Sequence, residues 1–335
     1  MQENATQCKF VDNPKVWVIV EDGLIGTQKQ CVALAEKLSD DIELKNFQLK
    51  QPWKSLAPYF SFGIGFGIAP KLSAPWPNII IAAGRKAISP ALWIKKKSKG
   101  ACFVIFIQDP RTKHNAFDLI CLPEHDGTRG ENIITMTGAL TNISPAMLEQ
   151  EKQNFPFLSK LPSPRIAVLV GGNSQSHVMD DASLNGIIVT LQELQKEYSA
   201  SLMVTCSRRT PIEAQAKIKD AIRTHRHSLF WEGNGPNPIL GYMGHADYIF
   251  VTNDSISMMS EAVSSGKPTY ILPLSGNNER FKHFYNELSS KNLARSYEGK
   301  LENWGQDALQ EASNVAAQVK SRYQEFVTNQ KNKTN

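Results

Sequence analysis

The sequence predicts an α/β protein of two doubly wound domains that face each other across a cleft. At 335 residues the chain is long for a single core. Apolar, β-branched runs alternate with amphipathic helical patterns, which is typical of parallel sheets covered on both faces. Each half also begins with a strand and a glycine-containing loop, "VIVEDGLIG" in the first half and "VLVGGNSQS" in the second. Ligands of such folds bind at the carboxyl ends of the strands.

The sequence pattern also predicts the positions of the strands and helices and of a domain boundary. The segment "FPFLSKLPSP", residues 155–164, contains three prolines and no regular period, so we expect a linker there between domains at 1–154 and 165–328. Strands are predicted at 16–20, 79–83, 103–107, 166–170, 202–205, 248–252 and 269–272. Helices are predicted at 28–38, 86–97, 184–198, 212–223, 256–265 and 278–289.

Composition narrows the class of protein. The 41% hydrophobic and 21% charged residues predict an ordinary soluble globular protein. The mild net charge of +5 favours anionic ligands or an anionic membrane surface, whereas a nucleic-acid binder would be expected to show denser Lys/Arg clusters. The five cysteines have no C-x-x-C spacing and four lie in or beside apolar segments, which predicts buried reduced thiols. "MQENATQCKF" lacks the pattern of a secretory signal. We therefore expect a cytoplasmic protein, peripheral on the inner face of the plasma membrane if it contacts a membrane.

Three loops of the second half carry residue types that suit an anionic ligand. Gly171 and Gly172 let the backbone approach a ligand without interference from a Cβ atom. Thr210 is a natural N-cap, which would place Arg208 and Arg209 beside the positive end of a helix, where phosphate binds. Two solvated arginines are the alternative. The loop "WEGNGPNPILGYMG" has too many turn formers for a core element and is predicted to lie on the surface near the same edge.

A fourth loop precedes a helix that carries one carboxylate. In "VTNDSISMMSEAVSSGKP" we expect Asn253, Asp254 and Ser255 to cap the helix, whose N–H groups and nearby hydroxyls suit an anion. Glu261 lies two turns further on among small residues. A carboxylate accepts two hydrogen bonds, which fits the 2′ and 3′ hydroxyls of a ribose. The alternative is a surface residue of the helix.

The order strand, N-D-S, helix with Glu, G-K-P, strand resembles the nucleotide-binding signature of GT-B glycosyltransferases, the group that includes the MurG enzyme of peptidoglycan synthesis. More specifically, the chain resembles the ELM1-like family, known from a plant mitochondrial-fission factor and many bacterial glycosyltransferase-like proteins. Matching pieces run through nearly the whole chain, among them "EDGLIGTQKQCVALAEKL", "IAAGRKA", "IQDPR", "FDLICLPEHD", "MTGALTNI", "VLVGGNSQSH", "TCSRRTP" and "RFKHF". The chain departs from the family near "GLIGTQKQ", where a Gly-His or similar pair is usual and no histidine stands.

The resemblance implies a GT-B fold with two Rossmann-like domains. The second would bind a nucleotide-sugar donor, UDP-linked, and the first a glycolipid or polysaccharide precursor whose hydroxyl attacks the sugar with inversion. No D-x-D motif is present, so we expect no metal and no cofactor, with the pyrophosphate held by helix N-termini and arginines. The donor-binding residues expected are Gly26, Thr27, Gly171, Gly172, Asn173, Ser174, Ser207, Arg208, Arg209, Thr210, Gly233, Asn234, Asn253, Asp254, Ser255, Ser257, Met258 and Glu261.

The base that would take the acceptor's proton is left open among the loops of the first domain. Asp22 follows the first strand, and Asp109 in "IQDPR" follows another. His125 and Asp126 in "PEHD" form a further pair, in which neighbouring acids could tune the imidazole toward neutral pH. For each of these residues, capping or turn chemistry is the alternative.

The stretch "SLAPYFSFGIGFGIAPKLSAPWP" has two interpretations. From Ser55 to Pro70 it is uncharged, it contains Tyr59, Phe60, Phe62 and Phe66, and lysines flank it. It is either an irregular buried segment or a surface within 55–76 that contacts a membrane carrying a lipid-linked acceptor. For the whole protein, the rival to a glycosyltransferase is an inactive GT-B scaffold that recruits partner proteins, as the plant member's role suggests.

Overall fold

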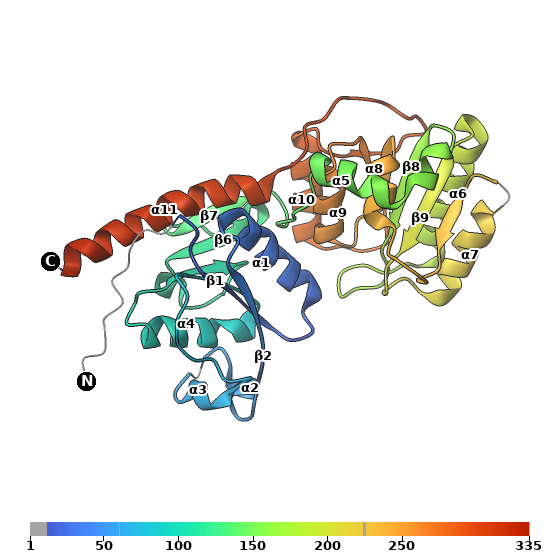
Figure 1. Cartoon of the computed structure of the whole chain (residues 1–335). Coiled ribbons are helices and arrows are strands. Elements are labelled where there is room, and N and C mark those ends of the chain that lie inside the picture. The colour runs from blue at the N-terminus through green and yellow to red at the C-terminus, as the bar shows by residue number, and fades with distance from the viewer. Residues whose placement is uncertain (1–11, 60, 224–225, 335) are drawn as a thin grey trace. The chain divides into compact units, whose positions relative to one another are not determined.

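The structure is a computed structural model that describes residues 12–59, 61–223 and 226–334, and its chain forms two compact units (Figure 1). Unit 1 contains the residues up to Asn142 together with those from Glu311 onward, and unit 2 contains Ile143–Gln310. One sheet runs through each unit. The predicted α/β class with two Rossmann-like domains is confirmed.

The sheet of unit 1 has the strand order β3-β2-β1-β4-β5-β6-β7, and every neighbouring pair except β2 with β3 is parallel. The strand order reverses beside β1, and doubly wound sheets bind ligands at the carboxyl ends beside such a switch point. The strands are β1 (Val16–Glu21), β2 (Ile42–Leu49), β3 (Ile68–Ala69), β4 (Ile79–Ala83), β5 (Phe103–Ile107), β6 (Leu119–Pro123) and β7 (Ile133–Met136). The helices are α1 (Ile25–Leu38), α2 (Trp53–Leu56), α3 (Ile64–Gly67), α4 (Ile88–Lys97) and α11 (Glu311–Thr334), with 3-10 turns η1 (Arg85–Ala87), η2 (His114–Ala116) and η3 (Glu124–Asp126).

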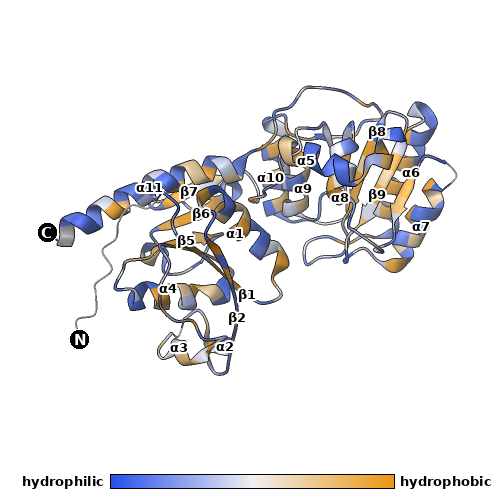
Figure 2. Cartoon of the chain, in the orientation of Figure 1, coloured by the Kyte–Doolittle hydropathy of each residue, from blue (hydrophilic) through white to orange (hydrophobic). Residues whose placement is uncertain are grey.

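Alternate side chains of the strands enter two separate cores. Along β1, Val16, Val18 and Val20 pack with residues of α1 and α11, whereas Trp17 and Ile19 pack with residues of α4 and of the segment 53–72. Burial on both faces requires apolar residues at consecutive positions, which is why the strands read as continuous hydrophobic runs. Figure 2 shows the central strands coloured as hydrophobic and the helices in both colours.

The sheet of unit 2 has the order β10-β9-β8-β11-β12-β13, and all its neighbouring pairs are parallel. One core lies under α6 and α7, and the other under α8, α9 and α10. The strands are β8 (Arg165–Val170), β9 (Ser201–Cys206), β10 (Leu229–Trp231), β11 (Tyr248–Thr252), β12 (Thr269–Leu272) and β13 (Arg295–Ser296). The helices are α5 (Pro145–Glu151), α6 (Asp181–Tyr198), α7 (Ile212–Ile222), α8 (Ile239–His245), α9 (Ile256–Val263) and α10 (Glu279–Ser290), with 3-10 turns η4 (Lys152–Asn154) and η5 (Pro156–Lys160).

The predicted linker and the predicted domain boundaries differ from the structure. Residues 155–164 belong to unit 2, because Leu158 is buried in its core and Phe155 packs against that core. The C-terminal helix α11 belongs to unit 1, because Val315, Val319 and other apolar residues along it enter the core beside α1. The prolines correctly indicated an irregular backbone, but they did not indicate that this segment packs into the core of unit 2.

The prediction that 231–244 is a surface loop is half right. Residues 232–237 are exposed, but α8 follows, and its residues from Gly241 to His245 are buried. Its glycines serve close packing: a Cβ atom at Gly241 would lie 2.4 Å from the Phe155 ring, and one at Gly244 would lie 2.7 Å from the carbonyl oxygen of Leu148. Two of the glycines that suggested a loop therefore belong to α8, where they allow Phe155 and Leu148 to pack against the helix.

The prediction from apolar runs does not find β2 and β6, because the apolar pattern of these strands is broken or short. In β2, exposed and buried residues are mixed because only one narrow edge strand, β3, lies beyond it. The strand β6 is completely buried, but its apolar run is short, ending at Pro123 just before the 3-10 turn η3. Within the described ranges, no helix has the length and apolar character that crossing a bilayer requires.

The free cysteines lie largely inside the two units. Cys31, Cys102 and Cys121 are buried thiols and Cys206 is half-buried, whereas Cys8 lies outside the described residues. Burial raises the pKa of Cys121 to about 12. The predicted buried, reduced thiols are thus confirmed for three of the positions.

The place of α11 in unit 1 can be tested with a buried charge. Val319→Asp puts a carboxylate into the core beside α1, and we expect it to destabilise unit 1 by at least about 3 kcal/mol, because an unpaired buried charge is strongly unfavourable. Ser321→Asp, an exposed position of the same helix, should change stability by less than about 0.5 kcal/mol. Hydrogen exchange of the β1 and β4 amides measures both effects; equal protection in the two variants would contradict this placement.

Candidate functional site

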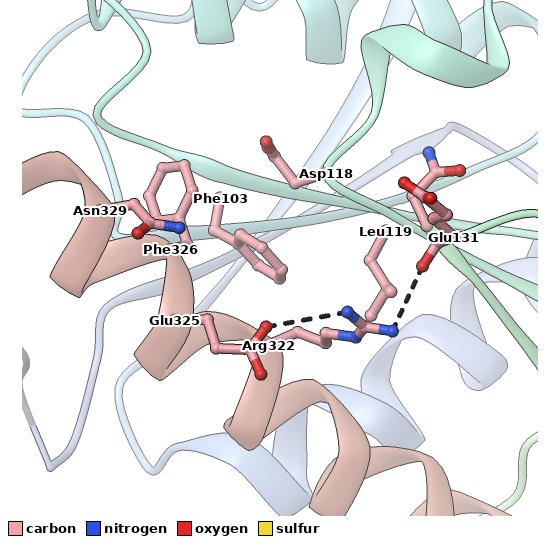
Figure 3. A pocket seen from close by; sticks show the side chains of 9 residues that line it. Phe103, Asp118, Leu119, Glu131, Arg322, Glu325, Phe326 and Asn329 are labelled. Atoms are coloured by element: carbon pink, nitrogen blue, oxygen red, sulfur yellow. Dashed lines mark hydrogen bonds and ion pairs between the residues drawn. The ribbon is translucent and has the colours of Figure 1, made fainter.

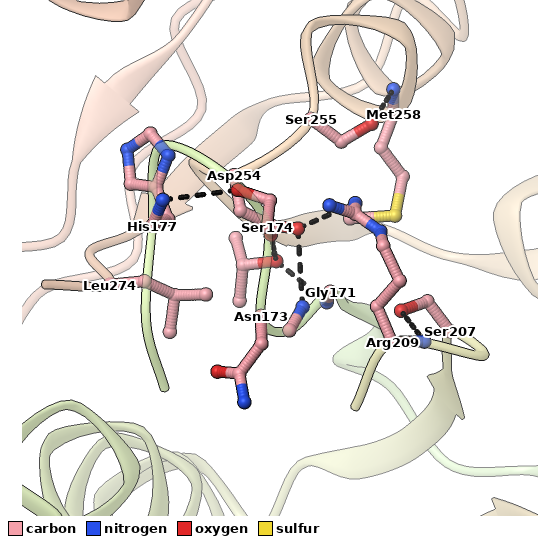
Figure 4. A network of polar contacts seen from close by, with 12 residues as sticks. Gly171, Asn173, Ser174, His177, Ser207, Arg209, Asp254, Ser255, Met258 and Leu274 are labelled. Atoms are coloured by element: carbon pink, nitrogen blue, oxygen red, sulfur yellow. Dashed lines mark hydrogen bonds and ion pairs between the residues drawn. The ribbon is translucent and has the colours of Figure 1, made fainter. Parts of the chain in front are cut away.

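The carboxyl end of the unit 2 sheet is organised around the buried carboxylate of Asp254 (Figure 4). This side chain accepts hydrogen bonds from the hydroxyl of Thr252 at 2.6 Å and from the backbone N–H of Gly172 at 3.1 Å. Arg209 donates a third bond from its guanidinium at 2.7 Å. The loops that follow β8, β9 and β11 therefore converge on one side chain, and its charge is paired as a buried charge must be.

The two glycines after β8 are required by this convergence. A Cβ atom at Gly171 would lie 1.9 Å from the Asp254 carboxylate, and one at Gly172 would lie 2.2 Å from the carbonyl oxygen of Arg209. Both distances are impossible for real atoms. The sequence interpretation, that these glycines give a ligand room, is wrong in this respect: the space that they free is filled by the neighbouring loops.

Thr210 also joins the loops and does not cap a helix. Its hydroxyl donates to the carbonyl oxygen of Gly171 at 2.5 Å, while the N–H of Gly171 donates to the Thr252 hydroxyl at 2.7 Å. The helix α7 begins at Ile212, and no side chain in the described part of the chain caps it. Thr210 is thus buried among backbone groups and positions the loop in which Arg208 and Arg209 stand.

Of the predicted N-D-S cap, only Ser255 caps α9. Its hydroxyl accepts from the N–H of Met258 at 3.3 Å, whereas the side-chain carbonyl of Asn253 accepts from the N–H of Leu274 and ties β11 to the loop after β12. In the first loop, Asn173 accepts from the N–H of Met179 at 2.8 Å. Asn253 and Asn173 therefore hold loops in place.

The same edge also carries several predicted contact residues that are exposed or half-buried. Arg208 is exposed, and the Arg209 side chain is 41% exposed although one of its nitrogens bonds Asp254. Ser257, Met258 and Glu261 are half-buried on α9. Four further predicted contacts also lie in loops at this edge, with Ser174 and Ser207 half-buried and Gly233 and Asn234 exposed, whereas the predicted contacts Gly26 and Thr27 belong to unit 1.

His177 is a further polar group beside this network (Figure 4). Its side chain is buried against Phe281, and its Nδ1 atom has no hydrogen-bond partner among the described residues. Burial lowers the pKa of His177; Asp254 opposes this shift and Arg209 adds to it, so the net pKa lies below the usual value. The ring is therefore neutral at pH 7, and it brings an unsatisfied nitrogen close to the loops.

Unit 1 presents its own set of loops at the carboxyl end of its sheet. Gly26 and Thr27 lie in the first turn of α1, after β1. Asp22 is exposed and accepts from the side-chain amide of Gln48 at 3.1 Å. His125 and Asp126 form η3 after β6, but the His125 side chain is only 1% exposed and its Nε2 atom lies 3.8 Å from Asp126.

Asp109 has a partner that the sequence analysis missed. One oxygen of its carboxylate accepts from the N–H of Arg111 at 2.7 Å and contacts Nε2 of His114 at 2.8 Å. Both side chains are partly exposed. The signal was a histidine five residues after the aspartate in "DPRTKH", a spacing that identifies a pair only when the loop folds back on itself.

A separate hollow in unit 1 lies at the opposite end of the sheet (Figure 3). It is lined by Phe103 and Leu119, the first residues of β5 and β6, and by Arg322 and Glu325 of α11. Arg322 donates to the carbonyl oxygen of Glu131 at 3.3 Å. Because doubly wound sheets bind ligands at their carboxyl ends, this hollow at the amino ends is not the candidate site.

The aromatic stretch forms an exposed surface, which we call the aromatic surface: Tyr59, Phe62 and Phe66. Phe62 is 84% and Phe66 86% exposed, while Phe60 lies outside the described residues. The backbone here packs directly against two tryptophan rings. A Cβ atom at Gly65 would be 2.5 Å from the Trp93 ring, and one at Gly67 would be 2.4 Å from the Trp53 ring. The side chains of Phe62 and Phe66 therefore point away from the core, and the interpretation as a buried segment is wrong for them.

In the part of the chain that the structure describes, no group of three or more His, Cys, Asp or Glu side chains is placed to hold a metal ion.

Comparison with known proteins gives a family for this arrangement. The family model described as mitochondrial fission ELM1 matches residues 25–323. An uncharacterised protein of Rickettsia prowazekii (strain Madrid E) is 30% identical over 354 residues, which covers 91% of this chain and 97% of that protein. The mitochondrial fission protein ELM1 of Arabidopsis thaliana is 26% identical over 279 residues, covering 73% of this chain and 63% of the plant protein. The match thus spans less than two thirds of the plant relative.

Solved structures support the fold. A protein of Listeria monocytogenes assigned as a UDP-N-acetylglucosamine 2-epimerase superposes with a TM-score of 0.53 and 13% identity, covering 94% of this chain and 91% of that chain. A UDP-glucosyltransferase of Polygonum tinctorium gives a TM-score of 0.50 and 10% identity, covering 96% and 95%. The predicted GT-B fold is confirmed, and at these identities the similarity concerns the fold alone.

The role of Arg209 as the cation that pairs Asp254 can be tested against its neighbour. Arg209→Ala leaves a buried carboxylate without its cation, and we expect it to destabilise unit 2 by about 1.5–3 kcal/mol. Arg208→Ala removes an exposed side chain and should have an effect below about 0.5 kcal/mol. Hydrogen exchange of the β8 and β11 amides measures the stability of unit 2. If the two variants are equally stable, the pair does not hold the loops together.

Proposed function

This chain belongs to the mitochondrial fission ELM1 family, and on that premise we propose that it is a glycosyltransferase. It moves a sugar from a UDP-linked donor to a hydroxyl of a cell-envelope glycolipid or polysaccharide precursor, with inversion at the anomeric carbon. The resemblance to this family noted in the sequence is confirmed by the match over residues 25–323. Two proteins with the same fold are named for UDP-linked sugars, which favours a uridine nucleotide as donor.

The observation that carries the proposal is the fixed position of Arg209. Its guanidinium is held by Asp254; Arg209 lies three residues before α7 and Asp254 two residues before α9. One bond to Asp254 leaves the other donors of the guanidinium for a ligand, and exposed Arg208 adds a second cation. Two arginines and a helix N-terminus suit a diphosphate, which a pre-positioned guanidinium can bind through two parallel hydrogen bonds.

Binding by arginines makes a metal unnecessary in this proposal. The cations and N–H groups at the edge of unit 2 take the place that a divalent ion has in other phosphate sites. Transfer then needs no metal and no cofactor besides the donor itself. Glu261, half-buried on α9, is proposed to accept hydrogen bonds from the ribose hydroxyls.

The aromatic surface of unit 1 is proposed to contact the membrane that carries the acceptor. From Leu44 to Gln108 the chain contains no Asp or Glu, and its charged residues are Lys45, Lys50, Lys54, Lys71, Arg85, Lys86, Lys95, Lys96, Lys97 and Lys99. Arg85 lies over the ring of Tyr59 at 5.3 Å, and Lys54 and Lys71 are exposed on either side in sequence. Exposed aromatic side chains among cations suit an anionic lipid surface.

The second candidate function is a scaffold without transferase activity. The plant relative is named a mitochondrial fission protein, a role that does not require sugar transfer. A scaffold does not need a ribose-selective nucleotide site, whereas a transferase does. Nucleotide binding therefore separates the two functions.

The nucleotide site is tested with UDP and 2′-deoxy-UDP in isothermal titration calorimetry, with and without excess EDTA. Wild type should bind UDP equally well under both conditions and should bind the 2′-deoxy nucleotide more weakly. Glu261→Ala removes charge-assisted bonds to the ribose, so UDP affinity should fall by about 1.5–3 kcal/mol and the preference for ribose should disappear. Glu193→Ala, at an exposed position on α6, should behave as wild type.

Three results would contradict parts of this model. Retention of the full ribose preference by Glu261→Ala would show that the carboxylate has another role. Loss of UDP binding in EDTA, restored by Mg²⁺, would exclude the metal-free site. Failure of wild type to bind any nucleoside diphosphate would favour the scaffold.

The membrane contact is tested by flotation with vesicles that contain phosphatidylglycerol. Replacing Phe62 and Phe66 together by Ser should weaken binding at least about tenfold, since each phenylalanine buried in the interface contributes about 1.5–3 kcal/mol. The thermal midpoint should hardly change, because both side chains are exposed in the folded chain. Phe157→Ser alters an exposed phenylalanine of unit 2 and should leave vesicle binding unchanged. Undiminished binding by the double variant would remove the membrane proposal.

A further inference from the structure

The exposed loop after β10 contains an asparagine followed by a glycine. This pair occurs twice in the chain, as Asn234-Gly235 in the loop and as Asn185-Gly186 within α6. Residues 232–237 are exposed, and Gly235 has a left-handed backbone with φ 75°. A Cβ atom at Gly235 would meet nothing within 4 Å except its chain neighbours. The two pairs therefore have the same sequence and different surroundings.

The reactive atoms of the loop pair make no hydrogen bonds among the described residues. Neither the side-chain amide of Asn234 nor the backbone N–H of Gly235 has a partner there. Gly186 lies inside α6, where its N–H takes part in the hydrogen bonding of the helix. An amide nitrogen that is held in a helix can neither lose its proton easily nor turn toward the side chain before it. The loop pair is thus able to react, whereas the helical pair is protected.

The indole of Trp231 activates the peptide group between the two loop residues. Its Nε1–H donates to the backbone carbonyl oxygen of Asn234 at 3.0 Å. This carbonyl belongs to the same peptide group as the N–H of Gly235. When that nitrogen loses its proton, resonance moves negative charge onto the carbonyl oxygen, and a donor already bonded to the oxygen stabilises it. The indole therefore favours the deprotonated amide, which is a nucleophile.

We propose that Asn234 is a modification site, at which the side chain spontaneously loses ammonia and becomes aspartate or isoaspartate. The Gly235 nitrogen gives its proton to hydroxide and forms a bond to the side-chain carbonyl carbon of Asn234, Cγ. The bond from Cγ to Nδ2 breaks, and Nδ2 takes a proton from water and leaves as ammonia, so that a cyclic imide remains. Water then opens the imide: cleavage at Cγ gives aspartate, and cleavage at the main-chain carbonyl carbon gives isoaspartate.

The product places a negative charge beside the edge where the nucleotide is proposed to bind, so this consequence rests on the proposed function. Because β10 pairs with β9 in parallel, the loops that follow the two strands are neighbours, and the loop after β9 carries Arg208 and Arg209. A carboxylate at position 234 opposes the field of these cations and repels a diphosphate. We therefore expect the modified chain to bind UDP more weakly.

The modification is measured on the full chain by peptide mass spectrometry during incubation in neutral and in mildly alkaline buffer. Each converted asparagine gains about 1 Da, and a protein-isoaspartate methyltransferase with labelled S-adenosylmethionine detects the isoaspartate. Asn234 should convert at least about tenfold faster than Asn185, because only the latter pair is held in a helix. Conversion at 234 should be faster in the alkaline buffer, since the nucleophile is the deprotonated nitrogen.

Two variants test the chemistry of the loop. Asn234→Gln should not convert on the same time scale, because glutamine would have to form a larger ring. Trp231→Phe keeps an aromatic ring and removes the indole N–H, and it should slow conversion about two- to tenfold, the effect of one lost hydrogen bond.

The effect on binding is measured with UDP before and after incubation. Asn234→Asp carries the charge from the start and should bind UDP at least about twofold more weakly than fresh wild type, and incubated wild type should lose affinity in the same direction. Gln192→Glu adds the same charge at an exposed position of α6 and should bind as fresh wild type does. The UDP affinity of Asn234→Gln should not change during incubation.

The outcomes separate this inference from the proposed function. Absence of conversion at 234, or equal conversion at 185, would overturn the modification site. Undiminished conversion in Trp231→Phe would show that the indole does not promote the reaction. Conversion without loss of UDP affinity would overturn the effect on binding. If the chain converts at 234 but fresh wild type binds no nucleoside diphosphate, the modification site stands, while the proposed function and the effect on binding both fail.

Discussion

The buried carboxylate of Asp254 is the constraint on which the edge of unit 2 depends. A charge without access to water needs hydrogen bonds and a cation, and it obtains them from three different loops: Thr252 on its own strand, Gly172 after β8, and Arg209 after β9. The loops therefore cannot move independently of one another. Glycine is needed at 171 and 172 because no side chain fits where they meet.

This constraint also prepares the edge for an anionic ligand. A free arginine side chain loses conformational entropy when it binds, whereas Arg209 is already held in one position. The conformational entropy of the Arg209 side chain is therefore lost on folding and not on ligand binding. Beside it, burial keeps His177 neutral, and α9 starts at a capped N-terminus. The same interactions that stabilise the loops therefore arrange the groups that the proposed nucleotide would contact.

Close contacts within unit 1 also determine which of its side chains are exposed. Gly65 and Gly67 let the chain lie directly on Trp93 and Trp53, so the aromatic residues between and beside them face outward. In the loop after β5, the chain folds back so that His114 contacts the Asp109 carboxylate. In both places a close contact inside the unit determines which side chains are presented to the outside.

The sequence by itself determined the α/β class, the central strands and the family, because burial on both faces of a parallel sheet leaves continuous apolar runs and because the loops keep recognisable motifs. It also located the edge at which Arg209 and Asp254 lie. Only the tertiary structure decided what these residues do, assigned α11 to unit 1, and brought His114 to Asp109. The physical reason is that periodicity records whether a residue is buried, whereas a hydrogen bond between loops depends on how separate strands are brought together in space.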